Sequence, residues 1–151
     1  MTETPPPSLG LLIADVFRLM RRRFDEKSKD TGLTRAQWQL LARLSKSEGI
    51  NQAGLADLLD MEPMSVCRLV DRMEESGWVT RKPDPADRRA RRLFLTQKAR
   101  PALEDMKPVV MELFDEAMEG LDPSEREQLL AALTVVRANL ARSNAQTAEY
   151  A

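Results

Sequence analysis

The chain has 151 residues, 42% apolar and 31% charged, which suits a globular domain with one hydrophobic core. It contains no histidine and one cysteine, so an internal disulfide and the usual structural zinc sites are excluded. No apolar run approaches the roughly 20 residues that a membrane-spanning helix requires, and no secretory signal is visible. We therefore expect a cytoplasmic protein.

Catalytic signatures are missing from the sequence. Without histidine the chain lacks the commonest general base, and no phosphate-binding glycine loop, dinucleotide fingerprint or nucleophile elbow occurs. Paired carboxylates at 25–26 and 115–116 fall at positions expected to lie on solvated helix faces. We expect no enzyme activity, no cofactor and no metal.

The near-neutral net charge hides an uneven distribution. Residues 81–100 hold eight basic and two acidic side chains, whereas residues 101–151 hold four basic and ten acidic ones. A basic surface concentrated in one segment favours a polyanionic partner such as DNA. The alternative is that residues 81–100 form only a solvated loop.

The first predicted element is an amphipathic helix that begins at a possible cap, Ser8, and ends near Asp30, after a disordered lead-in over residues 1–7. Its apolar stripe consists of Leu9, Leu12, Ile13, Val16, Phe17, Met20 and Phe24. The arginines at 21–23 point in three directions, and a solvated helix end is favoured for them over DNA contact.

Two shorter helices follow. Gly32 ends the first helix, and Thr34 begins the second with a capping box; the side chains expected inward are Trp38, Leu41 and Leu44. Asn51 is a good N-cap for a short third helix that reaches Leu59, with Leu55, Leu58 and Leu59 inward.

A helix over residues 62–75 and a hairpin come next. The helix has one apolar stripe, formed by Val66, Leu69, Val70 and Met73. Gly77 supplies a left-handed stop, after which Trp78 can fold back on that stripe. Strands at 79–82 and 91–95 flank a Pro- and Asp-containing turn. Short helix, turn, longer helix and hairpin together predict a winged helix-turn-helix reader.

The remaining chain is predicted to be helical. One helix begins near residue 99, and Pro108 is expected to kink or split it. Asp122 and Pro123 start another helix, and a flexible tail is expected over residues 143–151.

The predicted fold is mainly α with a small β-hairpin. The reader spans residues 32–98, and apolar helices over 8–31 and 99–142 flank it. A reader of this size does not need so much additional apolar surface, so we expect these helices to form a homodimer interface. The alternative is that they cap the core of their own chain. A two-fold dimer suits a palindromic DNA site with half-sites about 34–36 Å apart.

The chain resembles the MarR family of transcriptional regulators, particularly its SlyA-like branch. The most specific match is the segment DRRARRLFLT at residues 87–96, which fits the family's wing signature DxRxxxxxLT. Supporting matches are Leu33-Thr34 with Trp38, Leu55-Ala56, and LVDRME at residues 69–74 followed by Gly77. The resemblance covers residues 9–142 and implies a homodimer that binds pseudo-palindromic DNA.

The resemblance also implies which residues contact DNA. The helix over 62–75 would enter the major groove, and Arg89 would insert into the minor groove with its guanidinium held by Asp87. The expected major-groove residues are Met64, Ser65, Arg68 and Arg72. The expected phosphate contacts are Thr34, Asn51, Gln52, Arg81, Arg88 and Arg91, with Arg92 facing phosphate or solvent. Because Met64 and Cys67 depart from the residue types usual in this helix, the base preference of relatives does not transfer.

Many members of that family release DNA when a small aromatic acid binds, so such an effector is a possible partner. Trp38 matches a pocket position of SlyA-like relatives, and Phe17 and Met20 are expected near it; the simpler interpretation of all three is core packing. Cys67 is interpreted as a packing residue rather than a redox switch. The alternative functions are a winged helix that binds protein and, least favoured, a small enzyme.

Overall fold

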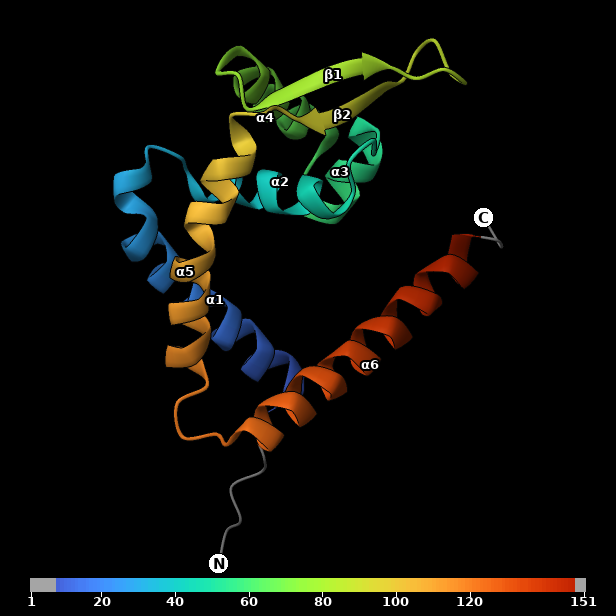
Figure 1. Cartoon of the computed structure of the whole chain (residues 1–151). Helices are drawn as coiled ribbons and strands as arrows, with labels where there is room; N and C mark the ends of the chain where they lie inside the picture. Colours follow the sequence, from blue (N-terminus) through green and yellow to red (C-terminus); the bar gives the residue numbers. More distant parts are fainter. Residues whose placement is uncertain (1–7, 149–151) are drawn as a thin grey trace, which may run out of the picture. The chain divides into compact units, whose positions relative to one another are not determined.

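The computed structural model describes residues 8–148, and the side chains of residues 8–142. The chain divides into two compact units, up to Leu113 and from Phe114 onward, which we treat separately. The elements are α1 (Leu9–Ser28), the 3-10 helix η1 (Lys29–Thr31), α2 (Arg35–Lys46), α3 (Gln52–Leu59), α4 (Pro63–Glu75), β1 (Val79–Pro83), β2 (Arg91–Leu95), α5 (Ala99–Ala117) and α6 (Pro123–Ala148) (Figure 1). This confirms the predicted mainly helical fold with one hairpin. None of the described helices combines the length and apolar character needed to cross a membrane.

The core of the first unit lies where α2, α3 and α4 pack against the two-stranded sheet. The strands are antiparallel, from Val79 opposite Leu95 to Pro83 opposite Arg91. The fully buried large side chains are Leu40, Leu41, Leu44, Leu55, Val66, Val70, Met73, Val79 and Leu93. The predicted apolar stripe of α4 therefore faces this core, and Leu69 and Trp78 pack against it while partly exposed.

Local capping signals explain where the helices of the reader begin and end. Thr34 and Gln37 form a capping box, because each side chain accepts a hydrogen bond from the other residue's main-chain N–H. Asn51 Oδ1 accepts from the main-chain N–H of Gly54 at 2.8 Å. Gly77 has φ +78°, and the Trp78 N–H reaches back to the Met73 carbonyl at 2.8 Å, which closes α4 with a Schellman motif. These three predictions are confirmed.

Several local predictions were wrong. Ser8 stands at the N-cap of α1 but its side chain makes no capping bond. Of the kink or split expected at Pro108, the split does not occur: α5 is continuous through the proline, and buried Met106 and partly buried Val109 pack on the core on both sides of it. Leu58 is 40% exposed rather than buried. α6 continues to Ala148, beyond the expected end at 142. The predicted lead-in over residues 1–7 lies outside the described residues.

The N-terminal helix exposes much of its apolar stripe. Leu9, Leu12, Ile13, Val16 and Phe17 are all between 42% and 58% exposed, although Phe24 packs on the core. The stripe predicted from the sequence exists, but in this chain alone it covers little of the core.

The second unit consists mainly of α6. Its start follows the predicted pattern: the Glu125 N–H donates to Asp122 Oδ1 at 2.9 Å, the Asp122 N–H donates to Glu125 Oε2 at 2.8 Å, and Pro123 is the first helical residue. Most of the large apolar side chains of α6 are also exposed, with Leu140 at 66%, whereas Val136 is half-buried.

Candidate nucleic-acid interface

The solvent face of α4 presents the side chains expected to read bases. Met64, Ser65, Arg68 and Arg72 are exposed, whereas Val66 on the opposite face is fully buried. Pro63 occupies the first turn of α4, where its missing N–H costs no hydrogen bond. The helix is thus fixed by one face and presents another to a partner. Cys67 is half-buried at the border, with Sγ 4.0 Å from Asp71 Oδ2.

The turn between β1 and β2 is organised by two aspartates. Asp84 accepts from the Ala86 N–H at 2.8 Å and from Arg92 Nε at 3.3 Å. The main-chain hydrogen bond from Ala86 and the pairing with Arg92 lower the pKa of Asp84, against an opposing effect of desolvation. Arg92 is therefore engaged within the hairpin, and phosphate contact is not its only available role.

Asp87 is bound to the backbone of Arg89, not to its guanidinium. Its Oδ1 accepts from the Arg89 main-chain N–H at 2.9 Å, and both side chains are exposed. The expectation that Asp87 holds the arginine fork when Arg89 is inserted in DNA stays a prediction. In this chain the carboxylate shapes the turn and leaves the Arg89 guanidinium in solvent.

The residues expected to contact phosphate divide into three groups. Thr34 and Asn51 are exposed helix caps, and a Thr hydroxyl that accepts from an N–H still has its hydrogen to donate. Arg88 and Arg91 are exposed on the turn, where Arg91 Nη1 lies 3.4 Å from the Arg88 carbonyl oxygen. Gln52 and Arg81 contact each other instead: Arg81 Nη2 donates to Gln52 Oε1 at 3.1 Å.

The root of the hairpin is tied to the loop after α2 and to α5 through a carboxylate that the sequence analysis missed. Glu48 Oε1 accepts from the Leu95 N–H of β2 at 3.0 Å and from Arg100 Nη2 of α5 at 2.9 Å. Next to it, the Gly49 N–H donates to the Leu93 carbonyl at 2.8 Å. Desolvation raises the pKa of Glu48, but the bonds from Arg100 and Leu95 outweigh it, and the pKa lies below its usual value.

The three residues expected in an effector pocket line one cavity of about 800 Å³. Phe17 and Met20 come from α1 and Trp38 from α2, and residues of α5, among them Arg100 and Val110, complete the wall. Trp38 is only 5% exposed, and its Nε1 donates to Thr31 Oγ1 at 3.0 Å, so it also serves the core. Trp38 therefore both lines the cavity and packs in the core, so this placement is compatible with a pocket residue and with a core residue.

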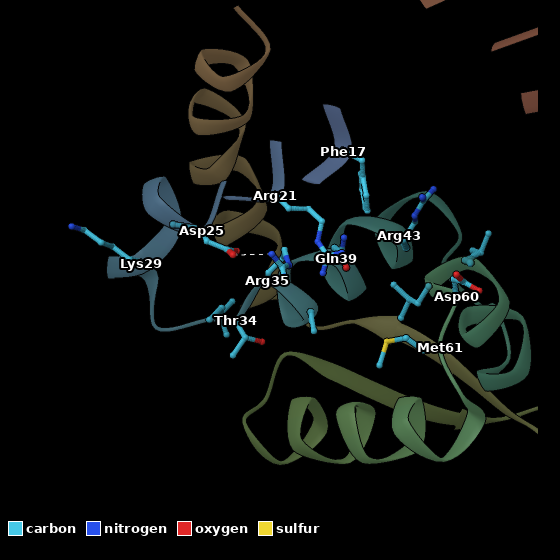
Figure 2. A pocket seen from close by; sticks show the side chains of 15 residues that line it. Phe17, Arg21, Asp25, Lys29, Thr34, Arg35, Gln39, Arg43, Asp60 and Met61 are labelled. Carbon is cyan, nitrogen blue, oxygen red and sulfur yellow. Dashed lines mark hydrogen bonds and ion pairs between the residues drawn. The ribbon is translucent and has the colours of Figure 1, made fainter. Parts of the chain in front are cut away.

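A second cavity, of about 810 Å³, shares Phe17, Arg21, Arg35 and Gln39 with the lining of the first (Figure 2). Arg21, Arg35 and Arg43 contribute guanidinium groups to it. Arg35 Nη1 pairs with Asp25 Oδ2 at 2.8 Å, and the Arg21 guanidinium lies 5.2 Å from the Phe17 ring centroid. Met61, from the turn that leads into α4, forms part of its wall.

Comparison with known proteins agrees with this architecture. Residues 33–90, which include α2–α4, β1 and the turn up to β2, match the sequence model of the MarR family. A MarR transcriptional regulator from Methanosarcina mazei Go1 is 28% identical, with a TM-score of 0.81 over 89% of this chain and 96% of that one. A cysteine-to-serine mutant of MarR from E. coli, solved in complex with operator DNA, is 28% identical, with a TM-score of 0.72 over 85% of this chain and 92% of that one.

The transcriptional regulator SlyA is similar in fold, with a TM-score of 0.77 over 90% of this chain and 96% of that one. Its identity of 24% supports the fold alone, so assignment to the SlyA-like branch stays a prediction. The family match over residues 33–90 and the agreement in fold over most of the chain give one conclusion: the reader carries the sequence pattern of the MarR family, and the chain has the fold of that family's transcriptional regulators.

Proposed function

We propose that the protein is a sequence-specific DNA-binding regulator that acts as a homodimer on a pseudo-palindromic operator. The observation that carries this proposal is the exposed face of α4, with Ser65, Arg68 and Arg72, beside a hairpin whose tip exposes Arg89. A helix of this kind fits the major groove, and an exposed arginine suits a narrow minor groove. A similar protein, a mutant of MarR from E. coli, has been solved in complex with operator DNA.

The dimer is supported by apolar surface that the chain does not cover by itself. Val16 of α1 is 47% exposed and Leu140 of α6 is 66% exposed. Exposed apolar stripes on whole helices are typical of oligomer interfaces. We assign residues 8–31 and 99–142 to dimerisation and residues 32–98 to DNA reading, and two-fold symmetry then matches the symmetry of the operator.

An effector that releases the DNA is the finer part of the proposal. Phe17, Met20 and Trp38 offer aromatic and apolar surface, and Arg100 offers a cation in the same cavity. A small aromatic acid matches this combination. Such a ligand releases DNA only if it binds the DNA-incompetent arrangement more tightly than the competent one.

The alternative function, a winged helix that binds protein, differs in what it requires of the hairpin. A protein-binding surface needs no cationic tip, whereas Arg88, Arg89 and Arg91 are all exposed there. We therefore favour DNA as the partner.

Selection of bound duplexes from a random library tests the proposal. Wild type and Arg89→Ala are each incubated with the library at moderate salt, and bound fragments are sequenced. Wild type is expected to enrich a motif with two-fold symmetry, and Arg89→Ala is expected to lose preference in the A·T-rich flanks. If wild type enriches no motif, the protein is not a sequence-specific DNA reader.

A further inference from the structure

The side chain of Arg81 points into the winged helix rather than into solvent. Arg81 belongs to β1, and its side chain is only 17% exposed. Three elements of the winged helix surround its guanidinium: β1 itself, α3 and α4. An arginine placed in this way has a different task from the exposed arginines of the turn.

Its contacts with α4 lie along one side of that helix. Arg81 Nη2 is 2.7 Å from Asp71 Oδ1, and Nη1 is 3.1 Å from Glu74 Oε1. Glu74 Oε2 also accepts from the Arg81 main-chain N–H at 2.9 Å, so this carboxylate holds backbone and side chain together. Nη2 lies 3.5 Å from the Cys67 carbonyl oxygen. Residues 67, 71 and 74 are spaced so that they share a helix face.

The same guanidinium reaches α3. Gln52 Oε1 accepts from Arg81 Nε at 3.3 Å and from Nη2 at 3.1 Å. A guanidinium presents its N–H donors in one rigid plane, so bonds to several elements fix their mutual orientation. Desolvation lowers the pKa of Arg81, but Asp71 and Glu74 outweigh this effect and raise the pKa, so the guanidinium stays charged. We call Arg81 together with its partners Gln52, Cys67, Asp71 and Glu74 the clamp.

The clamp face of α4 differs from both of its other faces. Val66, Val70 and Met73 face the core, and Arg68 and Arg72 face solvent. Apolar packing holds α4 against the core through one face, and the directional bonds of Arg81 add a second constraint on its rotation from another face. With side chains about 5–6 Å from the helix axis, a rotation of about 10° moves a reading side chain by about 1 Å. A shift of that size impairs a binding constellation.

We propose that Arg81 is a positioning residue for DNA reading: it joins the hairpin to α3 and α4 and sets the rotation of α4 at which Ser65, Arg68 and Arg72 meet base edges. This inference rests on the proposed function. It replaces the expectation that Arg81 contacts phosphate, because two carboxylates within 3.1 Å already compensate its charge. Arg81 thus acts on DNA through α4.

The test compares operator affinity with affinity for a scrambled duplex over a series of salt concentrations, using the full chain and the operator selected by wild type. Arg81→Met is expected to lower operator affinity by about tenfold or more while leaving scrambled-duplex affinity and the salt slope unchanged. A lost phosphate contact would instead weaken both duplexes alike and reduce the slope by about 0.9. Arg81→Lys, which keeps the charge without the planar fork, is expected to behave like Arg81→Met.

Removal of a carboxylate that pairs with Arg81 has different expected effects on DNA affinity under the two roles. Under the proposal, Glu74→Gln lowers the ratio of operator to scrambled affinity, although it removes a negative charge near DNA. If Arg81 were a phosphate ligand, releasing it from Glu74 would tighten both duplexes equally. Glu75→Gln is the matched control, because it removes one exposed negative charge from the same helix outside the clamp. It should leave the ratio unchanged.

The outcomes separate this inference from the proposed function. A wild type that selects no motif overturns both. A wild type that selects a motif, with the ratio unchanged in Arg81→Met and Glu74→Gln, overturns the clamp alone, whatever happens to the melting temperature. If Arg81→Met does not fold, Glu74→Gln decides the matter, because it leaves Arg81 in place.

Discussion

The Asp87 carboxylate accepts a hydrogen bond from the main-chain N–H of Arg89 at 2.9 Å, and the Arg89 side chain is exposed. An asparagine oxygen can accept the same bond, so Asp87→Asn should bind operator within about twofold of wild type, whereas Asp87→Ala should lose the turn and bind several-fold more weakly. Fluorescence anisotropy titrations measure both. If Asp87→Asn is as weak as Asp87→Ala, the charge matters and the aspartate does hold the guanidinium when DNA is bound.

Arg68 and Arg88 should have different effects on binding. Arg68 lies on the solvent face of α4, and Arg88 lies on the exposed turn. Arg68→Ala should cost about 1–3 kcal/mol and relax the preference at one base pair of each half-site. Arg88→Ala should weaken all duplexes alike and reduce the salt slope by about 0.9.

Arg88 is the better phosphate probe than Arg92, because Arg92 Nε is bound to Asp84 at 3.3 Å and its removal would also disturb the hairpin. Titrations against operators with single base-pair changes measure the preference. Identical effects of Arg68→Ala and Arg88→Ala on affinity, preference and slope would contradict this division.

Glu48 should make stability depend on pH in the acid range. Its folded-state pKa is below the usual value, so its contribution is present above about pH 4.5, its value in the unfolded chain, and is lost as pH falls through the lower folded value. Glu48→Gln can still accept from the Leu95 N–H but loses the charge pairing with Arg100. We expect a melting temperature about 2–4 °C below wild type near pH 7, corresponding to about 1 kcal/mol.

The difference between wild type and Glu48→Gln should shrink as the pH is lowered below about 4.5 and through the lower folded pKa. Arg100→Met, which removes the other partner, should show the same pH dependence. Thermal scans by circular dichroism at a series of pH values measure both variants. A difference that stays constant across that range would mean that the ionised form of Glu48 contributes nothing to stability.

The exposed stripe of α1 should be part of the dimer interface. Val16 is 47% exposed in the single chain, and a glutamate there would place a charge in an apolar interface. Val16→Glu is expected to weaken dimerisation by about 2 kcal/mol or more per subunit. Sedimentation equilibrium measures the dimer dissociation constant of each variant. Gln97→Glu, which adds one negative charge at an exposed position of the reader, should leave the dimer intact; a wild-type monomer would refute the interface.

Sequence patterns predicted features that depend on neighbouring residues. The caps at Thr34, Asn51 and Asp122 and the left-handed stop at Gly77 each follow from interactions within a few positions. The stripe of α4 followed from helical periodicity, which also predicted which face of the helix is exposed. Pro108 does not split α5, and the core contacts of Met106 and Val109 on either side of it are not revealed by any local pattern.

Contacts between distant residues escaped prediction. Glu48 and Arg100 are 52 positions apart, and Gln52 and Arg81 are 29 apart, so neither pair leaves a periodic signal. From the sequence, Arg81 was one of several arginines in a basic segment. Only the placement of Asp71 and Glu74 beside it separates a half-buried, paired arginine from an exposed phosphate contact.

The most direct test of the account is chemical footprinting of the selected operator with wild type and Arg89→Ala. Guanine methylation reports on the major groove, and hydroxyl-radical cleavage reports on the minor groove. For wild type we predict two protected major-groove segments about one helical turn apart, with protected minor groove outside each. Arg89→Ala should lose only the outer protection. A single asymmetric footprint, or identical footprints for the two proteins, would contradict a two-fold reader with α4 in the major groove and Arg89 in the minor groove.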